Sequence, residues 1–232
     1  MPMAGQLQGT LTFLFTDLVA STRSWEESPA GMREAMERHD RIVSRCLKRH
    51  HGEDGGRAGD SVLAIFRRAG DAAACALALQ RELASEPWQP PTRLATRIAL
   101  HSGEVQRRQG RYYGQALNRC ARLLATCHGG QVLISQATEQ LLVDELPAGA
   151  ALWDLGLHEL KDLRRPEHSL EALLRGQRVE IHDPISVQAR PVARARGSRY
   201  QEQSSGQHKR KSKSRAHEIY FRIPNPNRAG RG

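Results

Sequence analysis

The run that decides the fold reads T-L-T-F-L-F-T-D and spans residues 10–17. Threonine, phenylalanine and leucine dominate it, and β-branched and aromatic residues favour strands. Apolar side chains fall on both faces of the run, as in a strand that is covered on both sides of its sheet. The sequence therefore predicts a buried strand, with the carboxylate of Asp17 directly at its end.

A second buried strand is predicted at residues 61–66, which read S-V-L-A-I-F. It follows Asp60, which lies in a glycine-rich stretch that is predicted as a turn. If the two strands are neighbours, Asp17 and Asp60 meet at one end of the sheet. Such oxygens suit Mg²⁺ or Mn²⁺, and a metal pair can hold both reacting oxygens of a phosphoryl displacement. A strand-end aspartate is more often a turn former or helix cap, so these two residues leave both interpretations open.

The remaining sequence alternates between helix and strand patterns. Apolar residues recur at helical spacing in several segments, and short β-rich runs lie between them. Helices are predicted at residues 26–51, 70–85, 115–127 and 136–143, a hairpin-like turn at 109–111, and strands at 93–100, at 131–134 and in two or three short segments up to residue 174. This alternation alone fits a doubly wound parallel sheet as well as a mixed sheet.

The positive charge of the chain is concentrated at its C-terminal end. The net charge is +10, and residues 175–232 hold fourteen Lys and Arg against four Asp and Glu. The folded domain is therefore close to neutral, and no nucleic-acid groove is expected on it. Residues 175–232 form a tail that has few apolar residues and is predicted to be mostly disordered. Its K-R-K-S-K-S-R run, residues 209–215, could bind nucleic acid or acidic lipid, or could be a solvated extension.

Length and composition limit the class of protein. A chain of 232 residues with 39% hydrophobic residues supports one domain, predicted at residues 10–174 after a short extension of residues 1–9. We expect a cytoplasmic protein without a membrane span, because the N-terminus lacks a signal pattern and no apolar run approaches about 18 residues. The four cysteines lack C-x-x-C spacing, which favours packed, reduced thiols.

Two further pairs of residues are suited to nucleotide chemistry. Ser21 and Thr22 precede a predicted helix, where their hydroxyls and backbone N–H groups could receive phosphate oxygens or simply cap the helix. Asn118 and Arg122 lie four apart on another predicted helix and therefore share a face. An amide beside a guanidinium could orient a sugar and neutralise charge on a phosphorane-like transition state, or could form an ordinary solvated surface.

Together these residues resemble the successive motifs of class III adenylate/guanylate cyclases. The motifs occur in the family's order and spacing over residues 10–174. The matching segments are F-L-F-T-D-L-V-A-S-T-R-S-W-E (residues 13–26), A-G-D-S-V-L-A-I-F (58–66), I-A-L-H-S-G-E (98–104), Y-Y-G-Q-A-L-N-R-C-A-R-L (112–123), H-G-G-Q-V-L-I-S (128–135) and L-G-L-H-E-L-K-D-L-R-R-P-E (155–167). The resemblance implies an α/β sandwich with a ferredoxin-like core and a mixed, mainly antiparallel sheet.

The resemblance also implies a metal site and a shared active site. Asp17, Asp60 and the backbone carbonyl of Leu18 would hold two Mg²⁺ or Mn²⁺ ions, and the ribose 3′-hydroxyl of ATP or GTP would attack the α-phosphate. Asn118 would position the ribose, and Arg122 would stabilise charge on the α-phosphate. Further nucleotide contacts are implied for Val19, Ala20, Ser21, Thr22 and Lys161. A head-to-tail homodimer would join the aspartates of one subunit to the Asn/Arg pair of the other.

Three positions depart from the family pattern. The purine-selecting positions hold Gly56, which has no side chain to read a base edge, and Arg111, which reverses the usual charge. Neighbouring Arg57 points to the opposite face if the segment is a strand. The glycine of the phosphate loop is Ala20. Two hypotheses follow: a metal-dependent cyclase with unusual purine selection, or a catalytically impaired nucleotide-sensing or dimerisation module of a regulatory protein.

Overall fold

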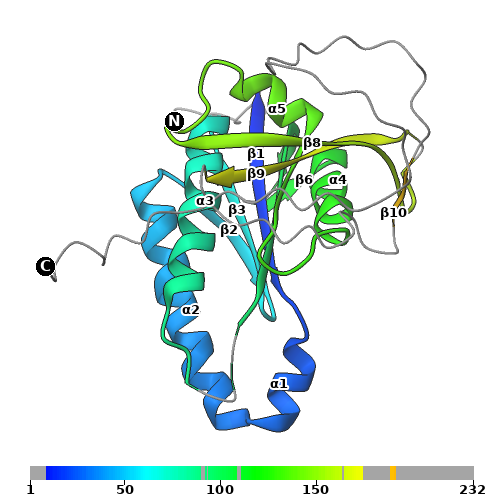
Figure 1. Ribbon diagram of the computed structural model, residues 1–232. Helices are drawn as coiled ribbons and strands as arrows, with labels where there is room; N and C mark the ends of the chain where they lie inside the picture. The colour runs from blue at the N-terminus through cyan, green and yellow to red at the C-terminus, as the bar shows by residue number, and fades with distance from the viewer. Residues whose placement is uncertain are drawn as a thin grey trace, which may run out of the picture.

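Strand β1, Thr10–Leu18, runs through the middle of the ordered domain in this computed structural model (Figure 1). The structure describes residues 9–89, 92, 94–108, 111–163, 165–174 and 189–191. The two antiparallel neighbours of β1 are β3, Ser61–Phe66, and β4, Thr96–Glu104. The predicted strand is confirmed, but it is longer than expected. Because β4 pairs with β1 as far as Leu18, Asp17 lies within the strand and not after it.

The first part of the chain forms a ferredoxin-like core. Four strands stand in the order β4-β1-β3-β2, all antiparallel, with two consecutive helices after β1 and one helix after β3. The remaining elements of this core are α2 (Pro29–Arg49), β2 (Glu53–Ala58) and α3 (Ala69–Ser85). The ferredoxin-like prediction is confirmed.

The sheet continues beyond the core on the β4 side. Its full order is β10-β8-β9-β7-β4-β1-β3-β2, and only β4 and β7 run parallel. The added strands are β7 (Val132–Ser135), β8 (Ala150–Leu160), β9 (Glu167–Leu174) and β10 (Ala189–Pro191), and a separate ribbon joins β5 (Gln106–Arg108) to β6 (Arg111–Tyr113). The sheet is thus mixed and mainly antiparallel, as predicted, and the doubly wound alternative is wrong.

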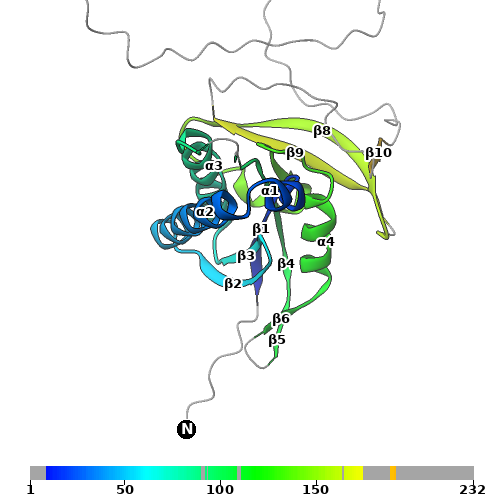
Figure 2. The same ribbon diagram turned by 90° about the horizontal axis from the view of Figure 1, so that it is seen from below.

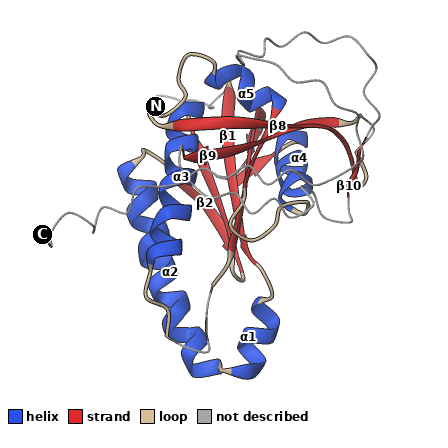
Figure 3. Cartoon of the chain, in the orientation of Figure 1, coloured by secondary structure: helices blue, strands red, loops and turns tan. Residues whose placement is uncertain are grey.

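Two hydrophobic cores explain why the opening run is apolar on both faces. Phe13 and Leu14 are consecutive and fully buried, and they point into different cores. Leu14 packs in a cluster with residues of α2, α3 and α5 (Gln136–Leu142), whereas Phe13 packs with residues of α4 (Gln115–Leu124). Helices α2 and α3 lie on one face of the sheet and α4 lies on the other (Figures 2 and 3). The four cysteines are buried free thiols.

Two local predictions are wrong. The predicted helix at residues 26–51 is interrupted: α1, Ser21–Glu27, ends before Pro29, which starts α2. Proline cannot donate a backbone hydrogen bond inside a helix, but it fits the first turn. The glycine-rich segment is strand β2, and only Gly59 and Asp60 form the turn. A side chain at Gly55 would come within 2.8 Å of Leu63, so close packing against β3 accounts for that glycine.

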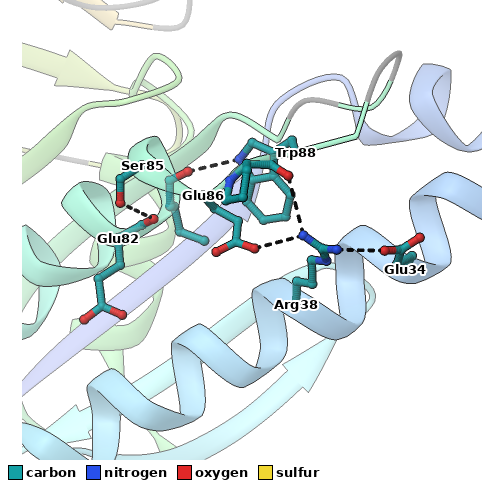
Figure 4. A network of polar contacts seen from close by, with 8 residues as sticks. Glu34, Arg38, Glu82, Ser85, Glu86 and Trp88 are labelled. Carbon is teal, nitrogen blue, oxygen red and sulfur yellow. Dashed lines mark hydrogen bonds and ion pairs between the residues drawn. The ribbon is translucent and has the colours of Figure 1, made fainter.

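A polar network holds α2 against the connection between α3 and β4 (Figure 4). Arg38 of α2 donates to Glu86 over 3.2 Å and to Glu34 over 2.9 Å. The indole N–H of Trp88 donates to the carbonyl of Leu83 over 3.0 Å. Trp88 also packs against the small buried cluster that contains Leu18, so this network supports the end of β1.

The C-terminal tail lies largely outside the described residues. Only residues 189–191 are described there, as strand β10, which pairs with β8. The predicted disorder of the tail, its basic run and the extension before Gly9 fall mostly or entirely outside the described part of the chain. Among the described residues, no helix combines the length and the apolar character needed to cross a membrane.

Candidate active site

Asp17 and Asp60 lie at the same end of the sheet, where β1 finishes and β3 begins. Asp60 occupies the turn between β2 and β3, next to Ser61. The hydroxyl of Ser61 donates to Oδ1 of Asp17 over 2.7 Å. The antiparallel register of β1 and β3, in which Thr16 stands opposite Val62, produces this arrangement.

Arg97 is a site residue that the sequence analysis missed. It lies opposite Asp17 on β4, and its guanidinium donates to Oδ2 of Asp17 through Nε, over 3.0 Å, and through Nη2. The Asp17 side chain is only 17% exposed, so the ion pair is partly sheltered from water. No motif spacing could reveal this contact, because 80 residues separate the partners and only the strand order brings them together.

Asp60 carries an unsatisfied oxygen. Its Oδ2 is buried and has no hydrogen-bond partner among the residues that the structure describes. A buried acceptor without a donor is costly, about 1–3 kcal/mol, and such exceptions commonly mark a functional site or an ion. Among the described residues, no group of three or more His, Cys, Asp or Glu gathers in a form suited to a metal. Two carboxylates therefore fit a hard cation that also takes backbone, water or phosphate oxygens.

The segment Val19–Thr22 leads from β1 into α1. The N–H of Val19 donates to the carbonyl of Ala95 over 2.9 Å. Ala20 is the N-cap residue of α1, and its methyl side chain has no atom that could accept a capping hydrogen bond. Ser21 and Thr22 are helical residues, so the alternative that they act as N-caps is wrong. The first N–H groups of a helix lack intrahelical acceptors and can face an anion.

Asn118 and Arg122 lie on α4 as predicted, four residues apart. Asn118 is exposed, and Nη2 of Arg122 forms an ion pair with Oδ2 of Asp162 over 2.9 Å. Lys161 is exposed in the turn after β8, next to Asp162. Among the described residues, no hydrogen bond or ion pair joins the two α4 residues to Asp17 or Asp60. In the described part of one chain, the α4 pair is thus not directly bonded to the aspartate pair.

The proposed purine-selecting positions lie on β2 and β6. Gly56 sits at a bulge with a φ of 126°, and a side chain there would meet open space. The guanidinium of Arg57 turns back to Asp40 of α2, at 2.5 Å. Arg57 therefore does not replace the absent Gly56 side chain. The backbone of Arg111 begins β6, opposite Arg108.

A cavity of about 390 Å³ lies elsewhere, between α4, α5, β4 and the start of β9. Its lining includes His101, Arg119, Gln140 and Glu167, and none of the predicted site residues. Burial, aided by the charge of Arg119, lowers the pKa of His101 to about 4. Its Nδ1 lies 2.8 Å from the hydroxyl of Ser135. His101 is thus a neutral, hydrogen-bonded core residue at neutral pH.

Residues 3–161 match the family model for the adenylate and guanylate cyclase catalytic domain. This span exceeds half of the chain. The chain belongs to that family.

Curated proteins similar to this cyclase domain include an uncharacterized protein and an adenylate cyclase. An uncharacterized protein of Mycobacterium tuberculosis is 47% identical over 161 residues, which cover 68% of this chain and 54% of that protein. An adenylate cyclase of Neurospora crassa is 31% identical over 153 residues, covering 55% of this chain and 7% of that enzyme. The chain thus spans about half the length of the mycobacterial relative that it matches.

Solved cyclase structures share the fold. An adenylate cyclase from Trypanosoma brucei, solved in its monomeric state, superposes with a TM-score of 0.66 at 22% identity and covers 71% of this chain and 89% of that chain. The adenylyl cyclase CyaB from P. aeruginosa superposes with a TM-score of 0.59 at 20% identity, covering 73% and 96%. At these identities the likeness establishes only the architecture of the cyclase domain.

Proposed function

We propose that this domain is a nucleotidyl cyclase that converts ATP or GTP into the 3′,5′-cyclic nucleotide and pyrophosphate. The ribose 3′-oxygen forms a bond to the α-phosphorus, the bond from that phosphorus to the pyrophosphate oxygen breaks, and the hydroxyl proton is released. The observation that supports this proposal is the placement of Asp17 and Asp60 at the same end of the sheet, where the buried Oδ2 of Asp60 has no hydrogen-bond partner among the described residues.

Asp17, Asp60 and the backbone carbonyl of Leu18 are the proposed holders of Mg²⁺ or Mn²⁺. Such ions supply Lewis-acid chemistry when bound, lowering the pKa of the 3′-hydroxyl and neutralising phosphate charge. Ser61 and Arg97 contact the two oxygens of Asp17 and orient its carboxylate. Arg97 also places a positive charge beside this end of the sheet, where phosphate oxygens would arrive.

The phosphates are proposed to contact the segment Val19–Thr22 and Lys161, and the ribose and α-phosphate to contact Asn118 and Arg122. No hydrogen bond or ion pair joins Asn118 or Arg122 to the aspartates within the described part of one chain. A head-to-tail homodimer would bring the two parts together and would create two equivalent sites.

A second function is favoured by two residues. Gly56 offers no side chain to a base, and Ala20 holds a left-handed φ of 57° at the proposed phosphate loop. Both features suit a domain that binds nucleotide or dimerises without efficient turnover. The alternative function is therefore a nucleotide-sensing or dimerisation module of a regulatory protein.

An assay of cyclic nucleotide product distinguishes the two functions. The purified chain is incubated with ATP or with GTP, in Mn²⁺, in Mg²⁺ and in EDTA, and cyclic nucleotide is quantified. We expect metal-dependent product that Asp17→Ala reduces at least about 100-fold, because this change removes a proposed metal ligand. Exposed Asp144 serves as the matched control, and Asp144→Ala should retain activity.

Circular dichroism of Asp17→Ala must show a folded domain for this comparison to hold. Product that persists after Asp17→Ala would contradict the proposed metal site. Nucleotide binding without product from either nucleotide would favour the sensing module.

A further inference from the structure

The guanidinium that the proposed function assigns to the substrate already has a carboxylate partner. Nη2 of Arg122 lies 2.9 Å from Oδ2 of Asp162, which is in the turn that follows β8. A carboxylate oxygen and a phosphate oxygen are both anionic acceptors for the same N–H donors. The ion pair therefore uses an N–H donor of Arg122 that a phosphate oxygen could otherwise accept from.

The backbone holds Asp162 in this position. Its φ of 62° is left-handed, a conformation that few residues other than glycine adopt and that aspartate tolerates better than most. The turn is closed by the N–H of Leu163, which donates to the carbonyl of Leu160 over 3.1 Å. The position of the Asp162 Cα is thus set by the turn and does not depend on the ion pair.

Helix α4 is held to the same region by a second ion pair. Arg119, one turn before Arg122, pairs with Glu167 at the start of β9, and the Glu167 side chain is only 5% exposed. This buried contact keeps α4 beside the turn. The Arg122 and Asp162 side chains are 42% and 60% exposed, so their own pair can open while the Arg119 pair stays closed.

We propose that Asp162 is an internal competitor for the substrate phosphate at Arg122. It neutralises Arg122 when no nucleotide is bound, and nucleotide must displace it. This inference rests on the proposed function, because that function assigns Arg122 to the phosphate. Exposed ion pairs are weak, so the competition lowers nucleotide affinity by about two- to five-fold.

The test compares nucleotide affinity in Asp162→Asn with that of the full wild-type chain. Asparagine keeps the shape and the tolerance for a left-handed φ, but it removes the charge. The probes are 3′-deoxy-ATP and 3′-deoxy-GTP with Mn²⁺, which lack the attacking hydroxyl, measured by calorimetric titration. We expect Asp162→Asn to bind about two- to five-fold more tightly. The matched control is Glu145→Gln, which breaks the exposed pair of Arg68 with Glu145 at 2.8 Å and should change nothing.

A double-mutant cycle separates competition from simple repulsion. Asp162 also neighbours Lys161, so removing its charge could favour any anion nearby. On an Arg122→Ala background, competition predicts that Asp162→Asn has no further effect, whereas repulsion predicts the same gain as in the wild type. The gain should also shrink in about 0.5 M salt, because exposed charges are screened.

Each outcome decides between the two claims. The inference is supported if Asp162→Asn binds nucleotide more tightly and if this gain is lost on the Arg122→Ala background. That result would support it even if no variant makes cyclic nucleotide and the proposed function fails. Product from the wild type with equal affinities in both proteins overturns the inference alone. Equal gains with and without Arg122 overturn it as well, and so does a failure of both proteins to bind the probes.

Discussion

At the scale of single residues, Ala20 carries a backbone strain that the sequence only hinted at. Its φ of 57° lies in the left-handed region, where a Cβ crowds the backbone and costs about 1–2 kcal/mol. The family pattern has glycine at this position, and the structure shows the physical reason. The strain sits between β1 and α1, directly beside the proposed phosphate contacts.

We therefore expect Ala20→Gly to stabilise the domain. Relief of the left-handed strain exceeds the entropy that glycine adds to the unfolded chain, which leaves a net gain of about 1 kcal/mol in the free energy of unfolding. Urea unfolding measures the change. Ala84→Gly, on the exposed side of α3, is the matched control and should destabilise by about 0.5–1 kcal/mol. A loss of stability in Ala20→Gly would show that the left-handed conformation is not strained.

At the scale of elements, β9 contains a carboxylate in an apolar setting. Glu171 is 6% exposed, and burial raises its pKa to about 7, while a weak contact with the Gln131 amide at 3.5 Å lowers it slightly. The folded state holds this proton up to about pH 7, whereas a free glutamate releases it near 4.5. Native Glu171 therefore makes the domain less stable as the pH rises through this window.

Glu171→Gln should remove that loss. Relative to the wild type, the variant should gain up to about 3 kcal/mol in the free energy of unfolding between pH 4.5 and pH 8. Urea titrations at several pH values measure the difference in the free energy of unfolding between the two proteins. The contributions of the titrating groups that both proteins share cancel in this difference. Glu159→Gln, on the exposed side of β8, should follow the wild-type profile. Parallel profiles for Glu171→Gln and wild type would rule out a raised pKa.

The ion pair of Arg119 with Glu167, which joins α4 to β9, predicts that substituting its two members changes the free energy of unfolding by different amounts. Arg119→Ala leaves the buried Glu167 carboxylate without its cation and should destabilise by about 2–4 kcal/mol. Glu167→Gln leaves a guanidinium that is 30% exposed and still hydrated, and it should cost less, about 1 kcal/mol. Thermal or urea unfolding compares the two. The control is Arg68→Ala, which removes an exposed ion pair and should leave the free energy of unfolding within about 0.5 kcal/mol of the wild type. Equal losses for Arg119→Ala and Glu167→Gln would contradict this prediction.

At the scale of the whole molecule, the proposed active site draws on two pairs of residues. Asp17 and Asp60 stand at a sheet end, Asn118 and Arg122 stand on α4, and no hydrogen bond or ion pair joins the two pairs among the described residues. A shared site predicts that subunits can complement one another. The same architecture would make single-chain activity impossible.

Mixing Asp17→Ala with Asn118→Ala should therefore restore activity that neither variant has alone. In a mixed dimer, one of the two sites receives an intact Asp17 and an intact Asn118. With random pairing, about half of the dimers are mixed and each has one working site, so about a quarter of wild-type activity is expected. Cyclic nucleotide production by a refolded mixture measures this. Two variants that both carry Asp17→Ala are the control and should stay inactive, and an inactive cross-mixture would contradict the shared site.

Much of the fold was predictable because it depends on local patterns. The run at residues 10–17 predicted a doubly buried strand, and the alternation of Phe13 and Leu14 between two cores is the structural counterpart of that pattern. The prediction of a turn at the glycine-rich stretch was wrong, because glycine occurs both in turns and where chains pack closely. At Gly55 only the proximity of Leu63 shows that close packing is the reason. The parallel alternative failed because strand order is a property of long-range pairing.

The sequence by itself determined the buried strands, the helical face that carries Asn118 and Arg122, the cyclase family and the neutrality of the domain apart from its tail. These depend on residue spacing and composition, which need no coordinates. Only the tertiary structure decided that Arg97 pairs with Asp17, that Oδ2 of Asp60 has no partner among the described residues and that Asp162 pairs with Arg122. The two ion pairs join elements that lie apart in the chain, and the unpaired oxygen of Asp60 depends on how its turn is buried. Strand register and packing set them, and no periodicity in the sequence encodes them.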